Sequence, residues 1–479
     1  MKKKLISIIA IILAVAALCI CLQVFVFDRN KDDFDENNVV LTFSAMSDIH
    51  QQMGKSNYAN KLINALDYSK ELNGGKDLDL ALFAGDLTEE TWRQQNDNYN
   101  ENYNADIEML KSTLDIALDA NKTAVFYSLG NHDTDPSELG SEYMSKIPEL
   151  FVKTLGAKYF AFDSEESIPE MGLRHIRLKG YDFFAVQPDS YWKLRGYSQS
   201  TLDWLDSKLA KVTAENPKKY VFVTAHPPIY GTVFGSFASD WADSDLAKVL
   251  EKYPQVIYFS GHIHNVLQDE MQISQNGSFT AVDCGSVKYT EVMNDINDSR
   301  TTSFDNNIGT RIEDFSQGLF VQVDKNGNVK ITRCDYYKKE TIKDSWVLSA
   351  PNKQKSHLNA YDNDMRIENN IAPTFNENSS FTAVKTSLGI LFNWDCATDD
   401  DMVRYYYLVV YQVKNGNKTR VKEYNIATFT YLYSQVSQMP TKLSYEGTGQ
   451  FDGELIAEIY AVDIWGKRSL PRSTQVTNE

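Results

Sequence analysis

The chain has 479 residues, which is more than one typical domain and favours two or three. Its formal net charge of −17 argues against a nucleic-acid polymer as a partner, because such binding depends on basic surface. The five cysteines include no closely spaced Cys-x-x-Cys pair in the part of the chain that follows the N-terminal apolar run, so neither a cysteine-rich zinc site nor a dense disulfide framework is supported.

The N-terminal segment is basic and then apolar. Three lysines at positions 2–4 precede an uncharged stretch at residues 5–27. This stretch is longer than the roughly 7–15 residues of a signal-peptide core and close to the roughly 20 that span a bilayer. It predicts an uncleaved transmembrane helix, a single pass through the cell membrane with the lysines in the cytoplasm and the rest of the chain outside. Cleavage as a signal peptide, which would give a secreted protein, is the alternative. Residues 28–38 are polar and acidic and predict a flexible stalk, so residues 1–38 form the anchor and stalk.

From residue 39 onward a unit recurs in which an apolar run of strand length is followed by a polar cluster and a helical stretch. The five runs cover residues 40–46, 78–84, 123–129, 220–225 and 256–260. The helical stretches between them cover residues 58–72, 105–120, 202–214 and 243–252. This alternation predicts an α/β domain over residues 39–368, with its polar clusters gathered at the carboxyl ends of the strands.

The composition changes near Asn369, and residues 369–479 consist of alternating runs separated by Gly, Asn and Pro. This spacing predicts a small all-β sandwich of the immunoglobulin-like class. The segments 392–395 (Phe-Asn-Trp-Asp) and 459–466, which ends in Trp465-Gly466, resemble parts of a fibronectin type III domain. Such a domain implies a spacer or docking module with a surface or protein partner.

Metal-donor side chains follow the predicted strands of the α/β domain. Five of the seven histidines do so, together with two aspartates and one asparagine at equivalent positions. These residues are Asp48, His50, Asp86, Asn131, His132, His226, His262 and His264. Mixed nitrogen and oxygen donors suit zinc, manganese or iron better than calcium. Their number exceeds the four ligands of one tetrahedral ion, which predicts two metal ions.

The same residues form an ordered set of motifs. Asp48-x-His50, Gly85-Asp86, Gly130-Asn131-His132-Asp133, His226 and Gly261-His262-x-His264 match, in this order, the motifs of the calcineurin-like metallophosphoesterases. The resemblance spans about residues 40–290 and implies a layered β-sheet sandwich flanked by helices. It implies that one divalent or trivalent ion of manganese, iron or zinc is held by Asp48, His50 and His264. A second ion would be held by Asn131, His226 and His262, with Asp86 bridging the two.

The resemblance also implies roles for two residues that do not ligate metal. His132 would face the substrate as a general acid, and Asp133 would orient the His132 ring. A turn or helix-cap residue is the alternative interpretation of Asp133. The implied reaction is hydrolysis of a small phosphomonoester or phosphodiester, in which a hydroxide bridging the two metals attacks phosphorus. The acidic net charge permits a phosphorylated substrate, because metal ions invert the local field.

Two rival interpretations remain at this point. One is a nucleotide-directed phosphodiesterase, and the other is a catalytically silent cell-surface binding protein on the same fold. The residues after Gly85-Asp86 lack the tyrosine that ligates iron in the purple acid phosphatase branch, which argues against a tyrosinate-ligated ferric site. Glu89 and Glu90 are interpreted as surface charges. Arg93 and Lys288 are cationic candidates for phosphate contact, but a plain surface role is the simpler interpretation.

Overall fold

The computed structural model describes residues 34–89, 99–134, 146–188, 196–237, 242–290, 315–351 and 360–478. The apolar N-terminal stretch that predicts a membrane anchor lies outside these residues, as does most of the predicted stalk. Within the described part of the chain, no helix combines the length and the apolar character needed to cross a bilayer.

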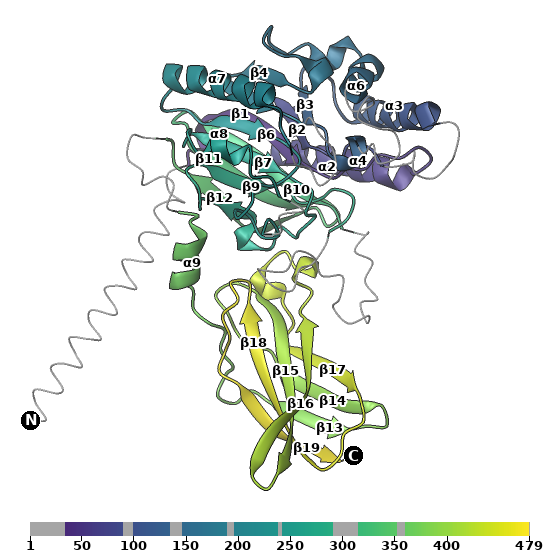
Figure 1. Ribbon diagram of the computed structural model, residues 1–479, viewed down its shortest axis with the longest axis vertical. Coiled ribbons are helices and arrows are strands. Elements are labelled where there is room, and N and C mark those ends of the chain that lie inside the picture. Colours follow the sequence, from purple (N-terminus) through teal and green to yellow (C-terminus); the bar gives the residue numbers. More distant parts are fainter. Residues whose placement is uncertain are drawn as a thin grey trace, which may run out of the picture.

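Residues 39–348 form a mixed α/β unit with two six-stranded sheets (Figure 1). The first sheet has the order β12-β11-β10-β1-β2-β3, and the second has the order β4-β5-β6-β7-β9-β8. The strands of the first are β1 (Val39–Met46), β2 (Leu80–Ala84), β3 (Ala124–Ser128), β10 (Gln317–Asp324), β11 (Val329–Asp335) and β12 (Glu340–Leu348). Those of the second are β4 (Arg174–Leu178), β5 (Tyr181–Ala185), β6 (Val221–Thr224), β7 (Val256–Ser260), β8 (Ile273–Ser274) and β9 (Thr280–Asp283).

The two sheets pack face to face around an aromatic core. Phe43 of β1 meets the rings of Phe183, Phe222 and Phe259 from the second sheet, with centroid distances of 5.4, 5.1 and 5.9 Å. All four side chains are fully buried. Strands β1 to β3 run parallel to one another, as do β5, β6, β7 and β9. Each sheet therefore ends in a row of strand tips from which the loops after β1, β2, β3, β6 and β7 emerge.

Helices cover the outer faces of both sheets. The first sheet packs against α2 (Ser56–Leu72), α3 (Tyr99–Ala117) and α6 (Ile147–Leu155), and the second packs against α7 (Gln199–Glu215) and α8 (Ala247–Leu250). Helix α8 is shorter than the stretch 243–252 that we expect from sequence, because the Asp243 carboxylate accepts a hydrogen bond from Leu246 N at 2.7 Å and forms a turn. The remaining short helices are α4 (Asn131–Thr134), η1 (Glu36–Asn38), η3 (Ala157–Phe160), η4 (Pro169–Met171) and η5 (Glu270–Gln272).

A seven-stranded arrangement with its own core follows at residues 381–478. Its strand order is β16-β15-β18-β19-β13-β14-β17. Trp394 is 2% exposed and its ring lies 5.3 Å from the Tyr406 ring, so it belongs to this core. The fibronectin type III resemblance stays a prediction. The elements are α9 (Asn363–Asn369), β13 (Phe381–Lys385), β14 (Gly389–Asp395), β15 (Val403–Lys414), β16 (Asn417–Ala427), η8 (Thr430–Leu432), η9 (Val436–Gln438), β17 (Lys442–Thr448), β18 (Glu454–Asp463) and β19 (Arg472–Asn478).

Candidate metal centre

Five of the predicted metal ligands have an unusual backbone conformation. Asp48, His50, Asp86, His262 and His264 all have positive φ angles, between 43° and 74°. Positive φ is uncommon for residues other than glycine, and it gathers at sites where the surroundings impose the strain. The strain occurs at the tips of β1, β2 and β7, where the chain turns sharply out of the sheet.

Hydrogen bonds between the strand tips hold these turns. His50 N donates to Asp86 O at 2.9 Å, and Asp48 N donates to Gly85 O at 3.1 Å. His262 N donates to the Asp48 carboxylate at 3.0 Å, which joins the two sheets. The tips are also closely packed. A Cβ on Gly261 would lie 1.7 Å from Ser47 Oγ, so this motif position accepts no side chain.

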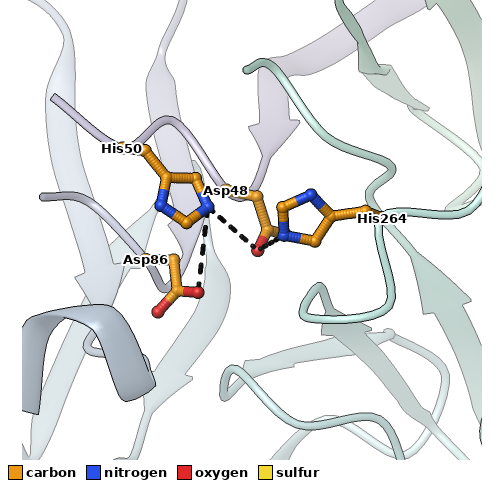
Figure 2. A group of neighbouring side chains, drawn as sticks. All are labelled: Asp48, His50, Asp86 and His264. Carbon is orange, nitrogen blue, oxygen red and sulfur yellow. Dashed lines mark ion pairs between the residues drawn. The ribbon is translucent and has the colours of Figure 1, made fainter. Parts of the chain in front are cut away.

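A first group of donors consists of Asp48, His50, Asp86 and His264, whose ligand atoms all lie within 4.8 Å of one another (Figure 2). His264 Nε2 lies 2.8 Å from Asp48 Oδ1. His50 Nε2 lies 3.8 Å from the same oxygen and 3.9 Å from Asp86 Oδ2. All four residues are buried. The first three of these side chains come from loops of the first sheet and His264 from the second, so the group joins the two sheets.

A second group shares Asp86 with the first and adds His226 and His262. His226 Nε2 lies 3.1 Å from Asp86 Oδ2 and 3.1 Å from Asn131 Oδ1. His226 Nδ1 lies 2.7 Å from the carbonyl oxygen of Ala84, which can only accept, so Nδ1 carries the proton. Once His226 is neutral, this tautomer leaves Nε2 without a proton and directed at the acid and amide oxygens, as a metal ligand requires.

The donor atoms fit a cation. Asp48 Oδ1, His50 Nε2 and Asp86 Oδ2 are buried and have no hydrogen-bond partner. The contact between His264 Nε2 and Asp48 Oδ1 is short, but it lacks hydrogen-bonding geometry. Buried polar atoms are otherwise almost always satisfied. Three such atoms that converge on one point fit a cation held among them.

The electrostatics of the centre support the same conclusion. Burial would raise the pKa of Asp48, but the neighbouring His264 and His226 outweigh burial and hold this pKa well below its usual range. Burial would lower the pKa of His226, but Asp86 and Asp48 outweigh it and raise the pKa to about 9. Without metal, the acids are thus balanced by protons on the histidines. A bound metal ion would displace these protons and balance the negative charge of the carboxylates instead.

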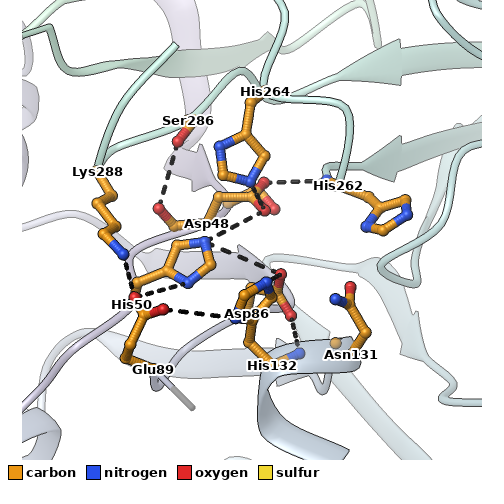
Figure 3. A network of polar contacts seen from close by, with 12 residues as sticks. Asp48, His50, Asp86, Glu89, Asn131, His132, His262, His264, Ser286 and Lys288 are labelled. Carbon is orange, nitrogen blue, oxygen red and sulfur yellow. Dashed lines mark hydrogen bonds and ion pairs between the residues drawn. The ribbon is translucent and has the colours of Figure 1, made fainter. Parts of the chain in front are cut away.

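His132 lies beside the two groups of donors (Figure 3). Its side chain is 24% exposed, whereas those of His50, His226 and His264 are 0%, 0% and 4% exposed. Its backbone N–H donates to Asp86 Oδ1 at 2.8 Å. Burial, reinforced by the neighbouring His50, lowers the pKa of His132 to about 4 against the opposing pull of Asp86. This position suits contact with a substrate rather than enclosure around an ion.

The Asp133 carboxylate links the loop after β2 to the loop after β3. Its carboxylate accepts hydrogen bonds from Leu87 N at 3.0 Å, Gly130 N at 2.9 Å and Thr88 N at 2.8 Å. The Thr88 hydroxyl adds a fourth at 2.8 Å. These contacts match the turn-residue interpretation that the sequence left open, because they fix the loop after β2 to the loop after β3. The orientation of His132 by Asp133 stays a prediction.

Glu89 is not the surface charge that the sequence suggests, and this expectation is corrected. Its side chain is 19% exposed and lies between two histidines, with Glu89 Oε2 3.4 Å from His50 Nδ1 and Oε1 3.6 Å from His132 Nδ1. Lys288 forms an ion pair with Glu89 and is 14% exposed, so the surface interpretation of Lys288 is corrected as well. The pairing of Gln51 with Thr88 beyond the ends of β1 and β2 places Glu89 there, and no sequence motif signals it. Glu90 and Arg93 lie outside the described residues.

Comparison with known proteins shows a similarity in the part of the chain that carries these residues. The model of the calcineurin-like phosphoesterase family matches residues 41–266. No curated protein matches the chain. Among solved structures, a bacterial orthologue of human α-L-iduronidase covers 90% of this chain and 99% of its own at 9% identity, with a TM-score of 0.20 that carries no argument about fold or function. The family match covers the strand tips after β1, β2, β3, β6 and β7, so residues 41–266, which carry these tips, are similar to the calcineurin-like phosphoesterases.

Proposed function

We propose that the chain is a metal-dependent hydrolase of small phosphomonoesters or phosphodiesters. The observation that carries this proposal is the convergence of buried, unsatisfied acid and imidazole atoms in two groups that share Asp86. One ion would be held by Asp48, His50, Asp86 and His264, and the other by Asp86, Asn131, His226 and His262. Manganese, iron and zinc all suit this donor set.

The proposed chemistry divides between the ions and the chain. Two bound cations would supply an activated water and neutralise charge on the phosphoryl oxygens. The chain would hold the substrate's leaving oxygen near His132, which is exposed toward solvent and would donate a proton or hydrogen bond to it. Glu89, 3.6 Å from Nδ1, would favour the doubly protonated His132 ring, in which Nε2–H is the proton given to the leaving oxygen.

The test is an assay of the full chain on p-nitrophenyl phosphate and bis-p-nitrophenyl phosphate, after metal removal and after addition of manganese or zinc. We expect hydrolysis that requires metal and that is lost in Asp86→Asn, since this variant removes the shared carboxylate. A preference for the diester would favour the nucleotide-directed phosphodiesterase. Two bound metals without hydrolysis of either substrate would refute catalysis on simple esters and favour the silent binding protein.

The proposed location is outside the cytoplasmic membrane, with the chain attached by its N-terminal segment. The lysines at positions 2–4 followed by the uncharged residues 5–27 support it. In this arrangement, residues 369–479 would present a partner-binding surface beyond the membrane. Protease treatment of intact cells tests the proposal, which predicts degradation of the phosphoesterase domain without cell lysis. Protection of the domain until lysis would refute the location and leave the chemistry untouched.

A further inference from the structure

The loop that carries two predicted metal ligands is buried along its whole length. Residues 261–269 lie between β7 and η5, contain no helix or strand, and are all buried. Connecting loops usually run over the surface, because their backbone polar groups need partners. Burial of nine irregular residues next to His262 and His264 therefore requires a covering element.

The C-terminal domain provides part of that cover. Val266 packs with Phe315 in a small cluster that Phe429 and Leu432 complete from the C-terminal domain. Gln268 Nε2 donates to Tyr433 O at 3.3 Å. Figure 1 shows η8 and the adjoining turns of this domain directed at the phosphoesterase domain. The loop at residues 261–269 is thus part of the interface between the two domains, hereafter the joint.

A buried ion pair between Arg404 and Asp269 joins the two domains. Arg404 lies at the start of β15, and its guanidinium pairs with Asp269 Oδ2, while the two side chains are 7% and 4% exposed. The guanidinium also lies 4.1 Å from the Phe234 ring centroid. Asp269 Oδ1 accepts from Met271 N at 2.9 Å, so the pair fixes the end of the loop. Removal of one member of a buried pair leaves an uncompensated charge.

The same loop is connected to the joint through glutamines. Leu267 N donates to Gln317 Oε1 at 2.8 Å, and Gln317 Nε2 donates to Gln268 Oε1 at 3.0 Å. Gln268 in turn reaches Tyr433 of the C-terminal domain. A chain of hydrogen bonds therefore runs from the C-terminal domain to Leu267, three residues beyond His264.

The backbone at the joint is strained. Phe429 has φ 55° and ψ 49°, a left-handed conformation that is a genuine outlier for a bulky residue. Such strain persists where the surroundings impose it, and it points to a constraint beyond packing. Here the strained residue is one of the two that pack against the cluster of Val266 and Phe315.

We propose that Arg404 is a positioning residue for the metal centre, and that the docked C-terminal domain holds residues 261–269 in the conformation that presents His262 and His264 to metal. This proposal rests on the proposed function in so far as those histidines ligate metal. It makes the C-terminal domain part of the active unit, in addition to any role in docking a partner.

The experiment measures metal affinity in the full chain with chelator competition, using manganese and zinc. We expect Arg404→Gln to weaken metal binding by about tenfold, the scale of residues that orient metal ligands. Arg404→Lys should recover part of the loss, because it restores the charge opposite Asp269. Arg420→Gln is the matched control, because Arg420 lies on β16 with a 61% exposed side chain and pairs at the surface with Glu423. It should bind metal as the wild type does.

Hydrogen exchange of residues 261–269 provides the second measurement, and Arg404→Gln should raise it in the metal-free protein. Wild-type metal affinity in a folded Arg404→Gln would overturn the proposal, since a merely structural pair lowers thermal stability without changing affinity. If Arg404→Gln does not fold, the same criterion applies to Arg404→Lys. Because the readout is metal and not turnover, two bound metals with no hydrolysis in the wild type would refute the proposed function and leave this inference standing.

Discussion

Neutralisation of Glu89 by Glu89→Gln should impair both metal binding and leaving-group protonation. Glu89 lies 3.4 Å from Nδ1 of His50 and 3.6 Å from Nδ1 of His132, so its negative charge acts on a predicted ligand and on the predicted acid. Burial opposes ionisation of Glu89, but His50 and Lys288 outweigh it and lower its pKa to about 2. The carboxylate is therefore charged at every practical assay pH.

The expected magnitude follows from this geometry. Two unit charges about 4 Å apart interact by about 4 kcal/mol at an effective dielectric constant of about 20, which is an upper limit for each contact. Glutamine keeps one hydrogen-bonding oxygen, so the net loss should be smaller. Residues that orient metal ligands typically change affinity or activity by about 10–100-fold, or roughly 1.4–2.7 kcal/mol. We expect a loss in that range for Glu89→Gln.

The assay compares metal content and hydrolysis of aryl phosphates that differ in leaving-group pKa. Glu89→Gln should lower metal affinity and increase the dependence of rate on the leaving group. Glu71→Gln is the matched control, since Glu71 pairs with Lys339 at 2.9 Å with a 56% exposed side chain. Glu71→Gln should leave metal affinity and hydrolysis rates at their wild-type values. Full activity in Glu89→Gln with every leaving group would refute the reasoning.

A second experiment separates the effect of Glu89 on the two histidines from its effect on Lys288. Glu89→Gln also leaves Lys288 without its ion pair, and that charge alone could disturb the centre. Lys288→Gln in the same protein removes the unpaired charge. If the double variant recovers wild-type activity, the lysine caused the loss and the orienting role is wrong. If the loss persists, the effect passes through His50 and His132.

Three further predictions concern the metal centre. His132→Ala should retain both metals and lose about 10²–10⁴-fold in rate, most for poor leaving groups. His264→Ala should lose metal as well as rate. Equal metal loss in the two variants would contradict the separate roles of acid and ligand. Apparent metal affinity should rise with pH up to about 9 and then level off. His50 and His226 have pKa values of about 9 without metal, and both must lose a proton to ligate. A metal affinity that does not change with pH would exclude this competition between protons and metal. Gly261→Ala should reduce metal content in elemental analysis, because a Cβ there would lie 1.7 Å from the nearest side-chain oxygen.

The convergence of the metal-donor residues at the strand tips could be predicted from the sequence, because two simple rules apply there together. Apolar runs mark the strands, and the carboxyl ends of parallel strands share one edge of a sheet. Asp48, Asp86 and His226 each follow such a run, so their convergence required no knowledge of contacts between distant segments. The pairing of β1 with β2 and of β6 with β7 is parallel, as this reasoning requires.

Glu89 and Lys288 were not predictable in the same way. Both stand beyond the strand ends, where position depends on how loops pair rather than on the periodicity of side chains. Their charge suggested solvent exposure, yet mutual pairing and two imidazoles make burial tolerable. The contact between Arg404 and Asp269 was hidden for a related reason, since it joins residues 135 positions apart across two domains.

Strain and unsatisfied charge occur at the same residues, and this coincidence argues for a centre built around cations. Each positive φ at Asp48, His50 or Asp86 costs roughly 1–3 kcal/mol, and a fold keeps such residues only where the surroundings impose them. The same three side chains contribute buried atoms with no hydrogen-bond partner. A structural role would favour relaxed turns and satisfied atoms at these positions. Metal coordination accounts for both features, because it fixes the turn geometry and gives the unpartnered donor atoms a partner.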